Sequence, residues 1–433
     1  IEYMKAAAKK SYGMKGDDIV QMNWKAIDMG AEGIVKVDVP ESWEDGVDEG
    51  LDYPAATTGT KEQQDFVNDV QIKVAAQEGN TIPVSVVARY MDGSTPSGTA
   101  AYEKRGVSVS VPVWTPDKCV ECGLCSYVCP HAAIRTVALT EAEAAAAPEG
   151  FQTKAVTGMP VYKFNIAIST MDCLGCGSCT NVCPTKSIEM KPLDDALKAQ
   201  QNLFDYAISV PDKEDVIAKF GAASVKGSQF RQPLLEFSGA CAGCGETPYA
   251  KLITQLFGDR MYIANATGCS SIWGNSSPST PYTVNKAGHG PAWDNSLFED
   301  NAEFGFGMAL AQKTLRSNLK DQVLAIAEKD AAVKAAADKW IETYNSTELN
   351  TDAAKALVEA LEKNGSAEAK AVVAEKDFLA KKSQWIFGGD GWAFDIGFGG
   401  LDHVLASGED VNVFVFNTEV YSNTGGQSSK ATP

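Results

Sequence analysis

The stretch Cys119-Val-Glu-Cys122-Gly-Leu-Cys125-Ser-Tyr-Val-Cys129-Pro130 returns 54 residues later as Cys173-Leu-Gly-Cys176-Gly-Ser-Cys179-Thr-Asn-Val-Cys183-Pro184. Each run has the spacing C-x2-C-x2-C-x3-C-P, which is typical of domains that hold two [4Fe–4S] clusters. Three thiolates of one run bind three corners of an Fe4S4 cube, and the last cysteine of the other run supplies the fourth ligand. We therefore predict one cluster held by Cys119, Cys122, Cys125 and Cys183, and a second held by Cys173, Cys176, Cys179 and Cys129.

Closely spaced cysteines also occur in zinc sites and in disulfide frameworks, and the sequence argues against both. Twin runs with this spacing are rarely zinc sites. Disulfide frameworks belong mainly to short secreted chains, whereas this chain has 433 residues and holds its 11 cysteines in tight groups. Thiolates that hold clusters need reducing surroundings, so we expect a cytoplasmic protein.

The length and charge of the chain limit its function classes. Its length predicts about two to four domains, and 44% hydrophobic residues are enough for buried cores. A net charge of −18 argues against nucleic acid as a partner, because phosphate binding needs clustered Lys and Arg. No uncharged apolar run reaches about 18 residues, and no signal peptide is visible, so we expect no membrane partner. The chain runs from Ile1 to Pro433 without an initiator Met, and we interpret it as part of a longer polypeptide.

Changes of pattern along the chain predict a multidomain protein of α/β and α+β class. The cysteine repeat marks a bacterial-type two-[4Fe–4S] ferredoxin domain. After it, helical signals alternate with buried β runs, as in an α/β domain that the chain contains only in part. An Ala-, Lys- and Glu-rich stretch over residues 309–382 predicts a helical insertion in that domain. The expected domains are 1–56, the end of an α/β domain; 57–105, a small linker domain; 106–215, the ferredoxin-like domain; and 216–433, the incomplete α/β domain.

Local periodicity predicts individual elements as well. Apolar residues recur with helical spacing over residues 17–30 and 63–77. Alternating apolar residues predict strands over residues 34–39, 83–90 and 107–114. A further helix is expected after residue 246, with Thr247 as its N-cap and Pro248 as its first residue.

Three cysteines lie outside the repeat. Cys241 and Cys244 form a Cys-x-x-Cys pair before the helix just described, and Cys269 lies in a loop of small residues after a buried strand. Spacing alone leaves three uses open: a third cluster that lacks one ligand, a redox-active pair, or ordinary core cysteines. His131, which follows Cys129-Pro130, is interpreted as an ordinary surface histidine, with hydrogen bonding beside a cluster as the alternative.

A Gly-Asp-Gly turn predicts a diphosphate and metal site. Trp385-Ile-Phe-Gly-Gly-Asp-Gly-Trp392 reads as a strand that ends in this turn, and 28 residues after Asp390 begins Thr418-Glu-Val-Tyr-Ser-Asn423. Glycines let backbone N–H groups reach a diphosphate, and a helix N-terminus favours its charge. A hard divalent cation prefers oxygen ligands, which Asp390, Thr418 and the Val420 carbonyl would supply. The alternative is an ordinary turn that contains an Asp.

Together these motifs closely resemble pyruvate:ferredoxin (flavodoxin) oxidoreductase, over essentially all 433 residues and in the interior-to-C-terminal part of its single-chain form. Tyr102-Glu-Lys-Arg105 resembles the signature of the short domain before the ferredoxin module of that family. Three longer strings resemble its thiamine domain: Gly239-Ala-Cys-Ala-Gly-Cys-Gly-Glu246, Ala264-Asn-Ala-Thr-Gly-Cys-Ser-Ser271 and Asn301-Ala-Glu-Phe-Gly305.

The resemblance implies three [4Fe–4S] clusters, thiamine diphosphate and Mg²⁺ (or Ca²⁺). Cys241, Cys244 and Cys269 would ligate the third cluster, whose fourth cysteine lies outside this chain. Asp390, Thr418 and Val420 would hold the magnesium ion, and Asn423 would act catalytically beside the cofactor. The residues implied to bind the cofactor are Glu246, Cys269, Gly389, Asp390, Gly391, Trp392, Thr418, Glu419, Val420, Tyr421, Ser422 and Asn423.

The activity implied by the resemblance is oxidative decarboxylation of pyruvate with coenzyme A to acetyl-CoA and carbon dioxide. Electrons would pass one at a time through the clusters to ferredoxin or flavodoxin. The family also implies a homodimer and a contribution from the remainder of the same polypeptide. Two alternatives stay open: an oxidoreductase for another 2-oxoacid, and a pure iron–sulfur electron-transfer subunit whose thiamine fold is degenerate.

Overall fold

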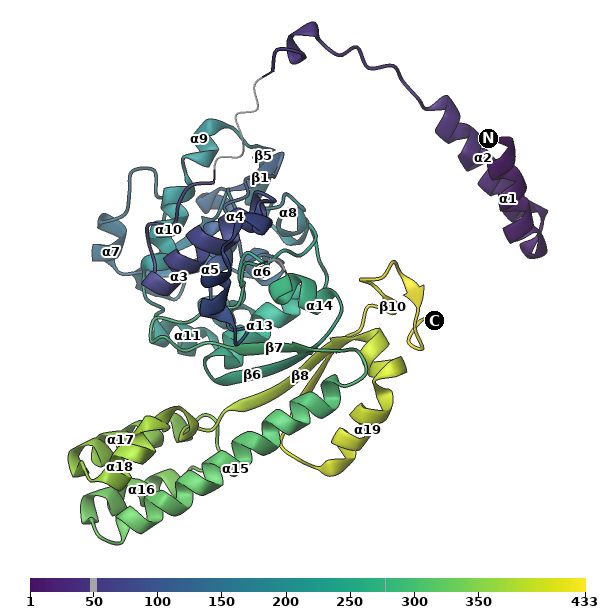
Figure 1. Cartoon of the computed structure of the whole chain (residues 1–433). Coiled ribbons are helices and arrows are strands. Elements are labelled where there is room, and N and C mark those ends of the chain that lie inside the picture. The colour runs from purple at the N-terminus through teal and green to yellow at the C-terminus, as the bar shows by residue number, and fades with distance from the viewer. Residues whose placement is uncertain (47–52, 277) are drawn as a thin grey trace. The chain divides into compact units, whose positions relative to one another are not determined.

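The computed structural model describes residues 1–46, 53–276 and 278–433, without the side chain of Ser276. The chain divides into two units, Ile1–Tyr53 and Pro54–Pro433 (Figure 1). No helix among the described residues is both long and apolar enough to span a bilayer.

Over its described residues, the first unit contains two α-helices, two short 3-10 turns and no strand. α1 (Glu2–Tyr12) and α2 (Asp17–Glu32) contact each other, and the Trp24 indole N–H donates to the Lys5 carbonyl at 2.8 Å. The helix predicted over residues 17–30 is confirmed. The strand predicted over residues 34–39 is wrong, because these residues are exposed and pair with no other strand. Alternating apolar residues form a strand only where a partner satisfies their backbone groups.

Short helical segments begin the second unit. They are α3 (Lys61–Phe66), a π-helical turn (Val67–Gln71), α4 (Ile72–Ala75) and α5 (Val84–Val87). The helix predicted over residues 63–77 is thus confirmed. The strand predicted over residues 83–90 is wrong: Pro83 caps α5, and Ala88–Tyr90 continue as a 3-10 turn. The fixed φ of Pro83 suits a helix start, and this outweighs the β preference of the valines that follow.

The cysteine repeat folds into two small antiparallel sheets. β1 (Ser110–Trp114) pairs with β5 (Ile188–Pro192), and β4 (Met159–Ile168) pairs with both β2 (Ile134–Leu139) and β3 (Lys154–Val156). The strand predicted over residues 107–114 is therefore confirmed only from Ser110 onward. The helices of this part are α6 (Leu124–Tyr127), α7 (Glu141–Ala145), α8 (Ser178–Val182), α9 (Asp195–Lys198), α10 (Gln201–Ser209), α11 (Glu214–Phe220) and α12 (Val225–Ser228).

A parallel sheet of four strands organises the rest of the unit. Its order is β7 (Ala292–Ser296), β6 (Met261–Ala266), β8 (Ser383–Gly389) and β9 (Asn412–Phe416). The chain leaves β6 for one edge and β8 for the other, so the carboxyl ends of these two neighbours mark a topological switch point. Ligands of open parallel sheets bind at such points.

Helices cover both faces of this sheet, as Figure 1 shows. α13 (Thr247–Phe257) packs with Ile263, Trp385 and Phe387 on one face. α15 (Asn301–Ala327) and α19 (Phe398–Ser407) pack with Ile386 on the other. Successive strand residues point to opposite faces, so these strands are apolar on both sides, as burial on both faces requires. The N-cap of α13 is Glu246 rather than the predicted Thr247, which places Pro248 second in the helix.

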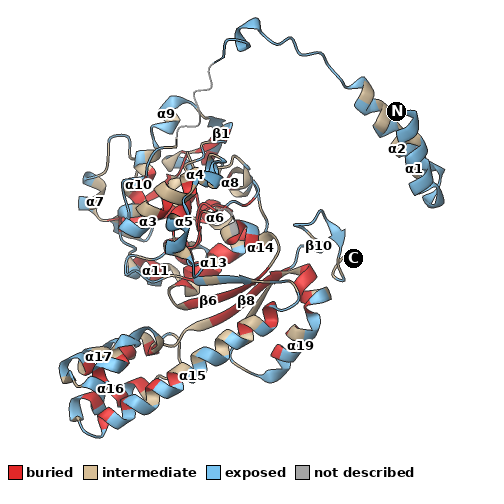
Figure 2. Ribbon diagram, viewed as in Figure 1, coloured by how far each residue is buried: buried red, intermediate tan, exposed pale blue. Residues whose placement is uncertain are grey.

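The predicted helical insertion is confirmed and has a core of its own. Beyond the part of α15 that lies on the sheet, it contains α16 (Ala331–Glu342), α17 (Asn350–Asn364) and α18 (Ala367–Ala374). Trp340 is fully buried among Val323, Leu357 and Leu361. Figure 2 shows this lobe with buried residues between the helices and exposed residues outside. Short elements complete the second unit: α14 (Cys269–Ser271), β10 (Val420–Tyr421) and β11 (Gln427–Ser428).

Candidate iron–sulfur and diphosphate site

Four thiols of the ferredoxin-like domain surround one cavity. Cys129, Cys173, Cys176 and Cys179, the set predicted for the second cluster, all line it. Burial raises the pKa of Cys173 to about 12, and the neighbouring Cys129 and Cys176 add to the rise. Such a thiol loses its proton when a metal coordinates it. Within the described ranges no group of three or more His, Cys, Asp and Glu residues is arranged to hold a single metal ion.

The first cysteine loop packs in an apolar core that also contains Cys179 of the second set. Burial raises the pKa of Cys125 above its usual range, and Cys119 and Cys122 act on it as neighbouring charges. Partial burial also raises the pKa of Cys183, but hydrogen bonds from Ser187 and Thr185 outweigh this effect and bring it to about 7. Cys119 and Cys183 both pack against this core. The place of Cys183 as fourth ligand of the first set stays a prediction.

The three remaining cysteines come together at the carboxyl end of β6. Burial raises the pKa of Cys269, and the charges of Glu246, Cys244 and Cys241 add to the rise. Gly243 lies so close to the second set that an added Cβ would be 3.6 Å from the Cβ of Cys176. This third set therefore lies between the ferredoxin-like domain and the parallel sheet. The proximity of the three thiols favours the third-cluster interpretation over ordinary core cysteines.

The two halves of the predicted metal motif meet at the carboxyl ends of β8 and β9. Asp390 is buried and accepts hydrogen bonds from the Thr418 backbone N–H (2.9 Å) and hydroxyl (3.3 Å). The Thr418 hydroxyl also lies 3.1 Å from the Val420 carbonyl oxygen. Glu419, between Thr418 and Val420, has a φ of 64°. This conformation is rare outside glycine, and it accompanies the close approach of the Thr418 hydroxyl and the Val420 carbonyl oxygen.

This oxygen set suits a magnesium ion. Neighbouring ligands of an octahedral Mg²⁺ lie about 3 Å apart, because each is about 2.1 Å from the metal. The Thr418 hydroxyl lies 3.3 Å from the Asp390 carboxylate and 3.1 Å from the Val420 carbonyl. All three donors are hard oxygens, which Mg²⁺ and Ca²⁺ prefer over nitrogen and sulfur. The residues therefore fit the cation that the sequence predicts.

One cleft brings most of the predicted cofactor residues together. It is lined by Glu246, Thr267, Gly268, Cys269, Ser270, Phe298, Gly389, Asp390, Gly391, Val420, Tyr421, Ser422, Asn423 and Thr424. The Ser422 hydroxyl donates to the Cys269 sulfur at 3.3 Å. Burial raises the pKa of Glu246, whose carboxylate accepts a hydrogen bond from the Trp273 indole at 2.8 Å. Cys269 belongs both to this cleft and to the third thiol set, so the two sites share a wall.

Three predicted cofactor residues do not line the cleft. Trp392 is fully buried and packs in the core with α15 and α19, against Gly388. Thr418 and Glu419 are not among the lining residues, although the Thr418 hydroxyl contacts Asp390 and the Val420 carbonyl, which are. The sequence also missed Phe298, which follows β7 and forms part of the wall. Its position after a parallel strand was the only sequence feature that could have predicted Phe298 as a wall residue. β7 is too short and too polar for periodicity to predict it as a strand.

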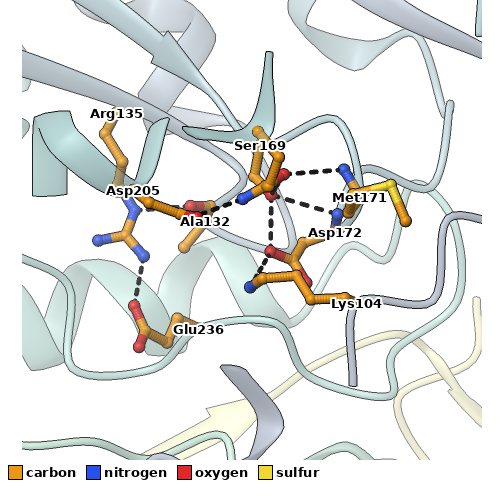
Figure 3. Close-up of polar contacts among 9 residues, drawn as sticks. Lys104, Ala132, Arg135, Ser169, Met171, Asp172, Asp205 and Glu236 are labelled. Carbon is orange, nitrogen blue, oxygen red and sulfur yellow. Dashed lines mark hydrogen bonds and ion pairs between the residues drawn. The ribbon is translucent and has the colours of Figure 1, made fainter. Parts of the chain in front are cut away.

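A buried polar network joins the ferredoxin-like domain to the segments on either side (Figure 3). The Lys104 ammonium pairs with Asp172 at 2.8 Å and lies over the Phe237 ring. Asp172 immediately precedes the second cysteine loop. Arg135 pairs with Glu236, just before the Cys241 loop, and both side chains are buried. Lys104 of the Glu-Lys-Arg signature thus contacts the approach to the second cysteine loop, and Arg135 contacts the approach to the third thiol set.

His131 is buried rather than exposed, so its interpretation as a surface histidine is wrong. Its Nε2 lies 2.9 Å from the Ala240 carbonyl oxygen, beside Cys241. Burial lowers the pKa of His131, although the hydrogen bond to Ala240 opposes this effect. The histidine links the end of the first cysteine run to the third thiol set. Sequence reasoning missed this role because residue order gives no sign that Ala240 lies close by.

Comparisons with known proteins agree with this geometry. Family models match residues 54–108 as the EKR domain, described as a domain of unknown function, and residues 118–187 as a 4Fe-4S dicluster domain. The dicluster match supports iron–sulfur clusters on the two cysteine runs.

Curated relatives match the whole chain. A pyruvate-flavodoxin oxidoreductase of Enterobacter agglomerans and a pyruvate:ferredoxin oxidoreductase of Moorella thermoacetica are each 51% identical over 100% of this chain and 37% of the relative. A pyruvate dehydrogenase (NADP(+)) of Cryptosporidium parvum is 41% identical over 100% of this chain and 25% of the relative. The chain thus spans between a quarter and little more than a third of the length of these relatives. With its cysteine sets and its cleft, the chain belongs to the family of pyruvate-flavodoxin and pyruvate:ferredoxin oxidoreductases.

Proposed function

We propose that this chain contributes the cofactor cleft and the electron path of an enzyme that oxidises pyruvate with coenzyme A. The products would be acetyl-CoA and carbon dioxide, and the electrons would go to ferredoxin or flavodoxin. The observation that supports this most is the position of Cys269, which lines the cleft beside Asp390 and also belongs to the third thiol set. A cluster on that set would touch the site where the substrate reacts.

The cleft suits thiamine diphosphate with magnesium. The cofactor, when bound, supplies the carbanion stabilisation that decarboxylation of a 2-oxoacid needs. Asp390, Thr418 and Val420 would hold the cation against the diphosphate, and Ser422 and Asn423 would orient the substrate from the same turn. Apolar side chains such as Phe298 and Tyr421 would keep water from the reacting atoms. Glu246, held by Trp273, would lie at the opposite wall.

The thiol sets suggest an order for the electrons. The third set adjoins the cleft through Cys269 and the second set through Gly243 and Cys176. The second set adjoins the first, since Cys125 of the first set packs in the same core as Cys129 and Cys179 of the second. Electrons would therefore leave the cleft through the third cluster, cross the second and exit from the first. The −18 net charge means that an acidic carrier needs a locally basic docking patch.

Several finer points belong to the same proposal. The third cluster takes its fourth cysteine from outside this chain, most substrate contacts come from the remainder of the polypeptide, and the enzyme works as a homodimer in the cytoplasm. The domain boundaries at residues 56, 105 and 215 are part of it as well.

The test is thiamine content and activity of the full-length protein, purified without oxygen. Asp390→Ala removes the carboxylate of the proposed cation site and is expected to abolish thiamine diphosphate binding and reduction of methyl viologen by pyruvate and coenzyme A. Asp402→Ala, an exposed carboxylate on α19, is the matched control and should retain both. Full thiamine content in Asp390→Ala would refute the cation assignment. Wild-type protein that binds thiamine but reduces viologen only with another 2-oxoacid would refute pyruvate as substrate.

A further inference from the structure

A lysine of the α/β domain is buried inside the ferredoxin-like domain. Lys251 lies on α13, seven residues after Cys244, and its residue is only 1% exposed. Its ammonium donates to the carbonyl oxygens of Ser126, of Tyr127 (3.2 Å) and of Cys129 (3.2 Å). These three oxygens use all three N–H donors of the ammonium.

The charge of Lys251 has no carboxylate partner. Among the described residues, no Asp or Glu forms an ion pair with it, whereas the half-buried Lys104 and the buried Arg135 each have one. Burial lowers the pKa of Lys251 to about 8, and the thiols of Cys129 and Cys125 oppose this effect. An isolated buried cation is costly. Its three hydrogen bonds place it against residues that belong to two thiol sets: Cys129 of the second set, and Ser126, which follows Cys125 of the first.

We propose that Lys251 is a positioning residue that sets the reduction potentials of both ferredoxin clusters from the α/β domain. Each cluster would gain one negative charge when it is reduced, so a fixed cation beside ligands of both sets would stabilise the reduced form of each. The low polarity around a fully buried ammonium strengthens this effect. Because the cation comes from α13, the clusters reach their working potentials only when the α/β domain is docked.

The geometry favours an electrostatic role over simple capping. Neutral donors can satisfy carbonyl oxygens at the end of a short helix, and no charge is needed for that purpose. Lys251 instead places a charge against the first cysteine run, at the carbonyls of Ser126, which follows Cys125, and of Cys129, on the same helix that follows the third set. The inference rests on the proposed function only for the presence of the clusters.

The experiment is a redox titration of the full-length protein followed by EPR. Lys251→Met keeps the length of the side chain and removes its charge, and Lys334→Met, an exposed lysine of the helical insertion, is the matched control. We expect both ferredoxin clusters of Lys251→Met to shift to more negative potentials. We expect the third cluster to shift least, and all three in Lys334→Met to stay unchanged. Potentials of loaded Lys251→Met equal to those of the wild type would overturn the proposal.

Loss of clusters needs a second variant. If Lys251→Met takes up too little iron, Lys251→Gln, which is neutral but donates to the same carbonyls, replaces it with the same expected shift. If neither neutral variant holds clusters and Lys251→Arg does, the cation is a structural requirement and the proposal is overturned. Titration with dithionite needs no substrate, so a failure of pyruvate to react would refute the proposed function alone. A wild type without clusters would refute both.

Discussion

Removal of Glu236 alone should destabilise the junction between the ferredoxin-like and α/β domains strongly. Its carboxylate pairs with Arg135, and the two side chains are only 10% and 7% exposed. In Glu236→Ala the guanidinium stays buried between the rings of Phe204 (5.7 Å) and Phe237 (5.6 Å) without its counter-charge. Breaking such a buried pair costs about 3–5 kcal/mol, which is roughly two to four orders of magnitude in the unfolding equilibrium.

The double variant Arg135→Met/Glu236→Leu gives the sharper comparison. Both charges are then replaced by apolar groups of similar volume, and such replacements change stability little or raise it. We expect the double variant to lie within about 1 kcal/mol of the wild type, well above Glu236→Ala. Urea unfolding under anaerobic conditions, followed by circular dichroism and by cluster absorbance, measures both. A loss below about 1 kcal/mol in Glu236→Ala, or an equal loss in both variants, would refute the reasoning.

Three further predictions concern the third thiol set, the cleft and the helical insertion. His131→Phe leaves the buried Ala240 carbonyl without its partner, which should lower the free energy of unfolding by about 1–3 kcal/mol. It should also slow cluster reduction, measured by stopped-flow absorbance. An unchanged rate would show that this contact does not position the third set. Gly391→Ala places a Cβ 2.3 Å from Cε1 of Tyr421, so its thiamine diphosphate content should fall sharply. Gly399→Ala, whose added Cβ meets nothing within 4 Å, should keep the cofactor. Equal thiamine content in the two variants would contradict the assignment of Gly391 and Tyr421 to the cleft wall. Trp340→Ala leaves a cavity at the centre of the insertion and should lower the free energy of unfolding, measured by calorimetry, by about 3–5 kcal/mol. Thiamine content should stay unchanged. A loss of thiamine would show that the insertion supports the cleft.

The correct site predictions from the sequence rest mainly on the spacing of the cysteines and on motifs that follow apolar strands. The cysteine repeat predicted which four thiols share a cavity, because ligand spacing in a cluster loop is a local property of the chain. The Gly-Asp-Gly and Thr418 turns were found because both follow apolar strands, and parallel strands bring their carboxyl ends together.

The residues that the sequence missed depend on contacts between distant segments. Lys251 reads as one residue of an amphipathic helix, and only the docking of α13 on the cysteine loops gives its charge a role. The valines of residues 34–39 and 83–90 misled the strand prediction, because strand formation depends on a partner that residue order does not specify. Trp392 was assigned to the cofactor by the motif, but the close approach of Gly388 directs it into the core.

The most direct test of the central claim is EPR of the full-length protein with substrate. Pyruvate is added to the anaerobic, oxidised enzyme, followed by coenzyme A, and the signals of reduced clusters are recorded after each addition. If the cleft delivers electrons to the third thiol set, cluster signals will depend on pyruvate and will grow rapidly when coenzyme A arrives. Clusters that are reduced by dithionite but remain oxidised with pyruvate and coenzyme A would contradict the account.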